Sequence, residues 1–112
     1  VCGCGGDREP DKRAKMGAAA QKLADDVIVT DDNPRTEDAA SIRKAVLTGC
    51  PDADEIGDRA EAIHAGITRL GPKDCLVIAG KGHEQGQIVG DKVIPFSDVE
   101  QAQLALKELG HG

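Results

Sequence analysis

The sequence has almost no aromatic residues, since Phe96 stands alone among 112 residues that include no Trp or Tyr. Single-stranded nucleic acids stack on aromatic side chains, and membrane proteins place Trp and Tyr at the bilayer interface. Basic residues are also outnumbered, 14 against 20 acidic ones, and the net charge of -6 disfavours phosphate backbones and anionic lipids. We therefore expect no nucleic-acid partner and no membrane partner.

Long apolar runs are missing as well, so the sequence predicts neither a membrane span nor a signal peptide. The four cysteines do not form the loop framework of a small secreted protein, which favours the cytoplasm. Cys2 and Cys4 would share one face of a strand, but a single C-x-C is a weak metal signal, and buried free thiols are expected. The chain starts without Met inside a strand-like segment, which suggests a part of a longer protein.

Short β-branched runs alternate with helix-forming stretches, a pattern typical of parallel strands joined by crossover helices. Strands are expected at 1–4, 27–30, 53–57 and 75–79, with the runs at 27–30 and 75–79 buried. Helices are expected at 12–24, from 36 or 37 to 47, at 58–70 and at 97–109. A hairpin is expected at 87–89 and 93–96, turning at Gly90-Asp91.

This pattern predicts one α/β domain over residues 1–112, in which a mostly parallel sheet is flanked by helices and followed by a short antiparallel hairpin near the C-terminus. Met16, Ala20 and Leu23 share one side of the first helix and should lie against the sheet. Gly49 is expected to stop the second helix, and Asp58 to cap the third.

Three loops follow the strand ends: GGDR at 5–8, DNPR at 32–35 and GKGHE at 80–84. Ligands of open α/β sheets bind beyond the carboxyl ends of the strands, so these loops should converge on one crevice. They supply guanidinium groups, an amide, a carboxylate, and glycines that allow close approach. This set suits a zwitterion, because a carboxylate pairs with the forked donors of Arg and an ammonium with a carboxylate and a carbonyl.

Each motif alone has a simpler interpretation. The glycines at 3, 5 and 6 resemble a dinucleotide loop, but Arg8 occupies the third glycine position. Gly80-Lys81 resembles a phosphate loop, but no glycine stands five positions earlier and Gly82 replaces the required Ser or Thr.

The DNPR segment can be a turn before a solvated Arg, and His83 beside Glu84 can be a structured loop pair. Arg59 and Glu61 are expected on the surface of a helix.

Five segments occur together in an order that resembles a known family: GCGGDR at 3–8, DDNPR at 31–35, DRAEAI at 58–63, AGKGHE at 79–84 and PFSD at 95–98. They closely resemble the last domain of MurE-type Mur ligases over essentially the whole chain. DNPR is similar to the signature of the enzymes that add meso-diaminopimelate rather than lysine. Cys2 stands where an aromatic residue is common, and Asp11 where a glycine often follows.

The resemblance implies a Rossmann-like domain that closes over a central ATPase domain in a cytoplasmic ligase of peptidoglycan biosynthesis. That ligase phosphorylates UDP-N-acetylmuramoyl-L-alanyl-D-glutamate with ATP, and the amino group of diaminopimelate then attacks the acyl phosphate. ATP and Mg²⁺ would bind mainly on N-terminal and central domains that this chain lacks, so no catalytic residue, cofactor or metal is expected here.

The resemblance also implies a binding site for the incoming amino acid, formed by Arg8, Asp32, Asn33, Pro34, Arg35, Gly80 and Glu84. Arg8, Asn33 and Arg35 would bind its carboxylates. Glu84 and the carbonyl of Gly80 would bind its distal ammonium. Asp32 would shape the loop, and Pro34 would stiffen it, because the proline ring fixes its own φ and disfavours helical backbone before it.

Two other functions remain open at this point. The chain can be a stand-alone α/β module that binds an amino acid without chemistry, or a fragment of a nucleotide-binding oxidoreductase. A phosphate-binding loop upstream in the full reading frame would decide for the ligase.

Overall fold

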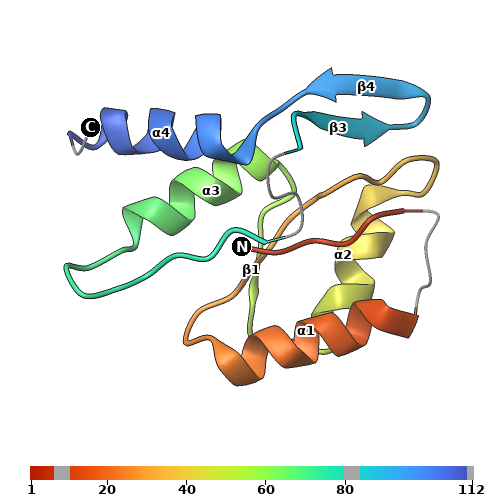
Figure 1. Cartoon of the computed structure of the whole chain (residues 1–112). Helices are drawn as coiled ribbons and strands as arrows, with labels where there is room; N and C mark the ends of the chain where they lie inside the picture. Colours follow the sequence, from red (N-terminus) through yellow and green to blue (C-terminus); the bar gives the residue numbers. More distant parts are fainter. Residues whose placement is uncertain (7–10, 80–83, 111–112) are drawn as a thin grey trace.

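The structure is a computed structural model, which describes residues 1–6, 11–79 and 84–110. Figure 1 shows α3 and α4 side by side at one end of the molecule and α1 and α2 at the other. In chain order the elements are α1 (Asp11–Leu23), β1 (Ile28–Val29), α2 (Ala39–Leu47), β2 (Asp54–Glu55), α3 (Arg59–Thr68), β3 (Gly86–Val89), β4 (Lys92–Pro95) and α4 (Asp98–Glu108).

Short parallel segments form the centre of the fold. β1 pairs with β2 in parallel, with Ile28 opposite Asp54. On the other side of β1, Cys2 forms a parallel bridge with Val29, in which the Cys2 amide donates to the carbonyl of Ile28 over 3.0 Å. The predicted strands at 1–4, 27–30 and 53–57 are therefore confirmed as shorter paired segments.

The segment at 75–79 runs beside the start of the chain. The amino group of Val1 donates to the carbonyl of Val77 over 2.9 Å, and the amide of Ala79 donates to the carbonyl of Val1 over 2.9 Å, the slanted pattern of parallel neighbours. The order across the sheet is thus 54–55, 28–29, 1–2 and 77–79.

The prediction that 75–79 is a buried strand is wrong. Val77 is 68% exposed and Cys75 is exposed, whereas Leu76 and Ile78 are partly buried against the helices. The segment is the outermost of the described parallel segments, and α3 and α4 cover one of its faces. Because side chains of an extended chain alternate between faces, every second residue of the run stays exposed.

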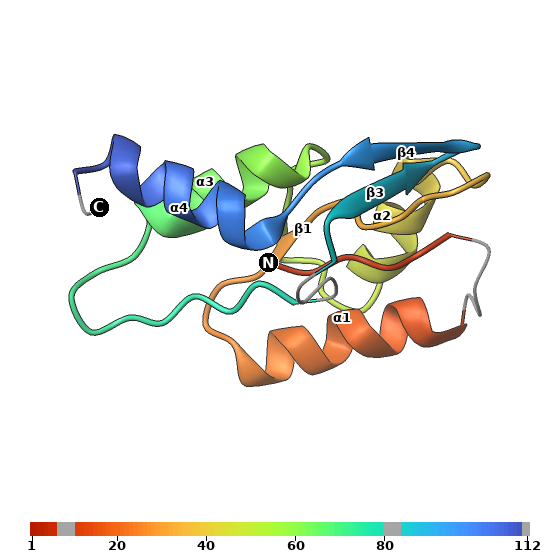
Figure 2. The ribbon, with the colours of Figure 1, turned by 45° about the horizontal axis from the view of Figure 1, so that its top comes forward.

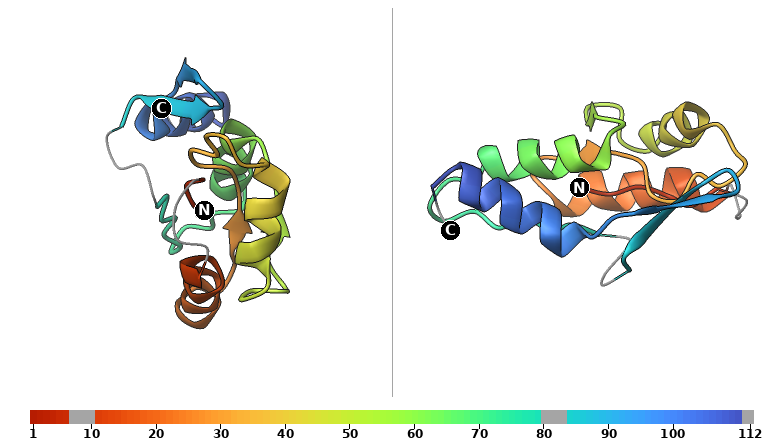
Figure 3. Two further views of the ribbon diagram at one scale, coloured as in Figure 1. Left: turned by 90° about the vertical axis from the view of Figure 1, so that its right-hand side faces the viewer. Right: turned by 90° about the horizontal axis from the view of Figure 1, so that it is seen from above.

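Two apolar clusters lie on the two faces of this arrangement, which gives three layers (Figure 3). Cys2, Val29 and Val46 belong to the cluster under α1 and α2. Val1 packs with Ile63 into the cluster under α3 and α4. The alternation of Val1 and Cys2 between the clusters follows from the two-residue period of an extended chain.

The predicted buried side of the first helix is partly wrong. Met16 and Ala20 pack against the core, but Leu23, the last residue of α1, is 84% exposed. No helix within 1–6, 11–79 and 84–110 is long and apolar enough to cross a bilayer.

Side-chain caps set the starts of three helices, because each satisfies a backbone N–H that has no helical partner. Asp58 accepts from the amide of Glu61 over 3.1 Å at the start of α3, as predicted. Asp38 caps α2, which therefore begins slightly later than expected, and Ser97 caps α4. The hairpin of β3 and β4 is confirmed, with its turn at Gly90, whose φ is 62° (Figure 2).

Glycines let α1 and α2 pack closely. A Cβ at Gly17 would overlap the carbonyl of Val46, and a Cβ at Gly49 would overlap the carbonyl of Ala14. α2 ends at Leu47, and its C-cap Thr48 has ordinary helical backbone. Gly49 follows at the end of the helix, as expected, and its missing side chain also lets α1 approach closely.

We predict that Gly17→Ala destabilises the 112-residue chain by about 1–3 kcal/mol, because the added methyl group meets backbone that cannot move aside. Helix propensity alone favours alanine over glycine by about 1 kcal/mol, so the contact with α2 must reverse the sign. Urea unfolding measures the difference. In the exposed control Ala19→Gly, propensity alone should cost about 1 kcal/mol. Greater stability of Gly17→Ala would contradict the close helix contact.

Candidate functional site

The strand-end loops at 3–6 and 31–35 pack against each other, as the parallel directions of their strands require. The amide of Gly6 donates to the carbonyl of Asn33 over 2.6 Å. A side chain at Gly6 would overlap the carbonyl of Pro34, and one at Gly3 would overlap the carbonyl of Thr30. Glycine in the first loop therefore permits direct contact between the two backbones.

The second loop is also held by the hairpin. The side-chain amide of Gln87 donates to the carbonyl of Asp32 over 2.7 Å, and the amide of Ile88 donates to Asn33 Oδ1 over 2.9 Å. The amide of Arg35 donates to the carbonyl of Ile88 over 3.0 Å. Asn33 and Pro34 are buried. The loop is thus a docked strand-like segment, and the interpretation of DNPR as a simple turn is incomplete.

Arg35 is the one described residue other than glycine with a positive φ, 53°. This conformation is uncommon for such a side chain, and here hydrogen bonds to the hairpin hold the backbone on both sides. Nη1 of Arg35 donates to the carbonyl of Gly6 over 3.0 Å and to that of Asn33 over 3.4 Å. The guanidinium group therefore lies at the junction of the first two loops, and it is half-buried rather than fully solvated.

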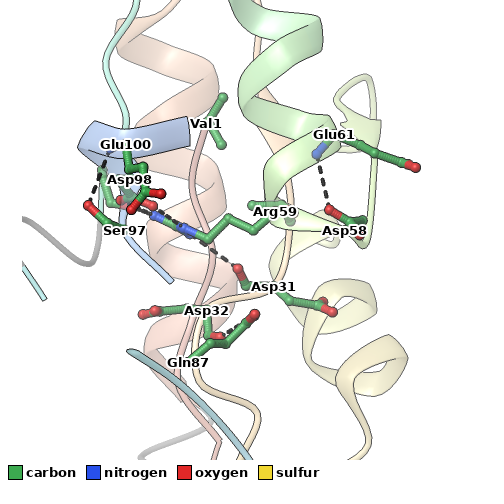
Figure 4. A network of polar contacts seen from close by, with 12 residues as sticks. Val1, Asp31, Asp32, Asp58, Arg59, Glu61, Gln87, Ser97, Asp98 and Glu100 are labelled. Carbon is green, nitrogen blue, oxygen red and sulfur yellow. Dashed lines mark hydrogen bonds and ion pairs between the residues drawn. The ribbon is translucent and has the colours of Figure 1, made fainter. Parts of the chain in front are cut away.

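A buried ion pair lies beneath the second loop, where Figure 4 shows Arg59 reaching toward both Asp98 and Asp31. Nε and Nη2 of Arg59 donate to the two carboxylate oxygens of Asp98, each over 2.7 Å. The Arg59 side chain is 0% exposed. The expectation that Arg59 is a surface residue is therefore wrong, because α4, which supplies its partner, covers it. Glu61 is exposed, as expected.

Another buried arginine reaches the first loop from α1. Nη1 and Nη2 of Arg13 donate to the two carboxylate oxygens of Glu37 over 2.9 and 2.7 Å, and Nη2 also donates to the carbonyl of Gly5 over 3.4 Å. Charge-assisted bonds of this kind are the stronger ones in proteins. Arginine side chains thus meet carbonyl groups of both loops.

The sequence-predicted site residues are only partly brought together. The contacts above join the backbone of Gly6 to Asn33, Pro34 and Arg35. Glu84 is exposed and lies shortly before β3, which binds the second loop. Arg8 and Gly80, and also His83, lie outside the described residues, so convergence on one crevice stays a prediction.

Sequence reasoning did not identify Gln87, Arg13 and Asp98 as parts of this region. Asp98 lies in the PFSD segment and Arg59 in the DRAEAI segment, so the motifs contained the pair without indicating that it forms. Gln87 and Asp32 are 55 positions apart. Local periodicity carries no information on such a contact.

Most of the cysteines are shielded from solvent. Cys2 and Cys50 are buried and Cys4 is half-buried, and burial raises the pKa of each of these thiols. The expectation of a buried thiol is wrong for Cys75. Over 1–6, 11–79 and 84–110, no three His, Cys, Asp or Glu side chains gather as metal ligands.

Two surface hollows lie away from the loops. One lies between α3 and α4 and is lined by Glu61, His64 and Gln101 among others. The other is lined by Asp26, Val27 and Asp54 among others, near the residues that start β1 and β2. Neither of these two hollows includes a residue of 31–35.

Residues 1–82 match the family described as "Mur ligase, glutamate ligase domain". The chain is 59% identical over 109 residues to the UDP-N-acetylmuramoyl-L-alanyl-D-glutamate--2,6-diaminopimelate ligase of Agrobacterium fabrum, which covers 97% of the chain and 22% of that ligase. It is 58% identical over 107 residues to the ligase of the same name from Caulobacter vibrioides, covering 96% of the chain and 22% of the relative.

A solved structure of a UDP-N-acetylmuramoyl-L-alanyl-D-glutamate--2,6-diaminopimelate ligase superposes with a TM-score of 0.93 at 40% identity, over 100% of this chain and 24% of that one. The superposition confirms the α/β fold, with its small parallel sheet, flanking helices and hairpin. The chain spans less than a quarter of the length of these relatives. Both the sequence match and the shared fold show that the chain belongs to the Mur ligase family, as one of its glutamate ligase domains.

Proposed function

We propose that this chain is the C-terminal, amino-acid-binding domain of a cytoplasmic ligase that adds meso-diaminopimelate to UDP-N-acetylmuramoyl-L-alanyl-D-glutamate in peptidoglycan biosynthesis. The observation that carries the proposal is the 59% identity to a ligase of that name across nearly the whole chain. The much greater length of the relatives favours a domain of a ligase over a stand-alone binding module.

The second loop is the proposed receptor of a carboxylate. Arg35 presents a guanidinium group at the junction of two loops, and its forked donors match the two oxygens of a carboxylate. Asn33 Oδ1 accepts from the amide of Ile88, and Asn33 Nδ2 is the N–H group that is proposed to donate to the carboxylate. Arg8, in the first loop, is proposed to add a further positive charge.

The third loop is the proposed receptor of the distal ammonium. Glu84 would supply the carboxylate and Gly80 the carbonyl oxygen, the acceptors that a protonated amine requires. Asp32 is proposed to shape the second loop, and its carbonyl already accepts from Gln87. Pro34 is buried in that loop, where its ring removes backbone freedom.

In the proposed reaction, ATP phosphorylates the free carboxylate of the UDP-linked dipeptide, and the amino group of diaminopimelate attacks the acyl phosphate and releases phosphate. This domain holds the nucleophile. Correct orientation of two bound reactants lowers a barrier by about 7 kcal/mol or more in favourable cases, so binding residues matter for the rate without exchanging protons.

ATP and Mg²⁺ are proposed to bind mainly on other domains of the ligase. Gly80-Lys81 is followed by Gly82 rather than the Ser or Thr that a phosphate loop uses to hold magnesium. Acidic side chains do not gather as metal ligands in the described part of the chain. The proposal therefore assigns the amino acid to this domain.

We predict that the purified 112-residue chain neither hydrolyses ATP nor forms the tripeptide product, because it lacks a phosphate loop. We also expect no sub-micromolar binding of free diaminopimelate, because other domains should complete the pocket. Phosphate release and calorimetric titration measure the two properties. Sustained magnesium-dependent ATP turnover by the pure chain would contradict the proposed division of labour.

A second prediction concerns selectivity in the full-length ligase. Diaminopimelate differs from lysine by one carboxylate on the distal carbon, the group assigned to Arg35 and Asn33. Charge-assisted hydrogen bonds contribute about 1.5–3 kcal/mol each, so Arg35→Ala should lower kcat/KM for diaminopimelate by about 10- to 100-fold or more.

Lysine is the internal control for Arg35→Ala, because it lacks the distal carboxylate and should lose far less. It need not become a good substrate, since a site arranged for a distal carboxylate gains nothing from a substrate without that group. Glu61→Ala, an exposed change on α3, provides a matched variant that should leave both values unchanged. Equal proportional losses for the two amino acids would mean that Arg35 acts through its bonds to Gly6 and Asn33, as a support of the loops.

A further inference from the structure

We propose that Arg59, oriented by Asp98, is a positioning residue that holds Asp31 and Ala79, the residues from which the second and third loops start, at a fixed separation for the bound amino acid. This inference rests on the proposed function. Figure 4 shows the guanidinium group of Arg59 between Asp98 and Asp31.

The first observation is the burial and geometry of the pair. Arg59 is the first residue of α3, and Asp98 is the first residue of α4. Two parallel bonds of 2.7 Å join the guanidinium group to the carboxylate, and the exposed fractions of the two side chains are 0% and 6%. A two-point contact of this kind leaves the guanidinium group a single orientation.

The second observation is the use of the remaining N–H groups. Nη1 of Arg59 donates to the carbonyl of Asp31 over 3.2 Å, and Nη2 donates to the carbonyl of Ala79 over 3.1 Å. Asp31 directly precedes the DNPR loop, and Ala79 directly precedes the GKGHE loop. One rigid, planar group therefore spans the two points at which these loops leave the strands.

A third contact connects the same pair to the far end of the third loop. The amide of Phe96 donates to the carbonyl of Gln85 over 3.2 Å. Gln85 follows Glu84, the proposed ammonium receptor, and Phe96 lies two residues before Asp98. The placement of Asp98 and the placement of Glu84 are thus coupled through a short stretch of chain.

Substitution of Arg59 by lysine separates a positioning role from stabilisation by charge alone. Lysine at position 59 would keep the positive charge beside Asp98, but a single ammonium group lacks the fork that reaches the carboxylate and both carbonyls at once. The loop origins would then separate or shift. A receptor split between two loops loses its fit when they move by about 1 Å, which can cost on the order of 100-fold in rate.

The test uses the full-length ligase with Arg59→Lys and, as a second variant, Asp98→Asn, which keeps the shape of the partner and removes its charge. Steady-state kinetics give separate KM values for diaminopimelate, ATP and the UDP-linked dipeptide, and thermal unfolding gives Tm. We expect KM for diaminopimelate to rise by about 10- to 100-fold, with the other two KM values within about twofold of wild type.

The matched control is Ile67→Val, a change in the apolar cluster shared by α3 and α4. It should lower Tm and leave all three KM values unchanged. An unchanged KM for diaminopimelate in folded Arg59→Lys, or a parallel rise of all three values, would overturn the inference. Failure of both variants to fold would assign the pair to folding and would also overturn it.

The proposed function is tested separately in the same assay by the wild-type enzyme. If wild type forms no product from diaminopimelate, the proposed function is wrong. If wild type is active and the variants keep its KM for diaminopimelate, only the positioning role of Arg59 is wrong.

Discussion

The bidentate ion pair between Arg59 and Asp98 is the contact on which the arrangement of the described site depends. It joins the starts of α3 and α4, and the same guanidinium group binds the carbonyls of Asp31 and Ala79. Removing one partner of a buried pair typically costs about 3–5 kcal/mol, because the other charge remains without compensation. One buried guanidinium group therefore holds together the starts of α3 and α4 and the segments at Asp31 and Ala79.

Three arginines bind backbone carbonyl groups in this chain, whose net charge is -6. Arg13, Arg35 and Arg59 each donate to a backbone carbonyl in or beside a strand-end loop. Carbonyl groups at a sheet edge need donors, and a guanidinium group satisfies several of them while adding positive charge. Arg13 and Arg59 are also paired with Glu37 and Asp98, so these two arginines join the loops to neighbouring elements without leaving a net positive charge.

The backbone of the second loop is strained at Arg35 and is held by hydrogen bonds to the hairpin. Arg35 has a positive φ, but the hairpin holds the main chain of the loop and Gln87 holds its first carbonyl. Side chains that recognise a ligand bind more tightly when their conformation is fixed before binding. In the proposed site, the docking of residues 31–35 on β3 would support selectivity, because a donor that is already ordered loses little entropy when it meets a carboxylate.

The sequence by itself determined the elements whose signals are local. The β-branched run at 27–30, the cap at Asp58 and the turn at Gly90 predicted the alternating α/β pattern and the hairpin, and five ordered segments indicated the family. Only the tertiary structure decided that Arg59 is buried, that Leu23 and Val77 are exposed, and that Gln87 holds Asp32. Caps and periodicity act within a few residues, whereas burial and ion pairing depend on which distant segment covers a side chain.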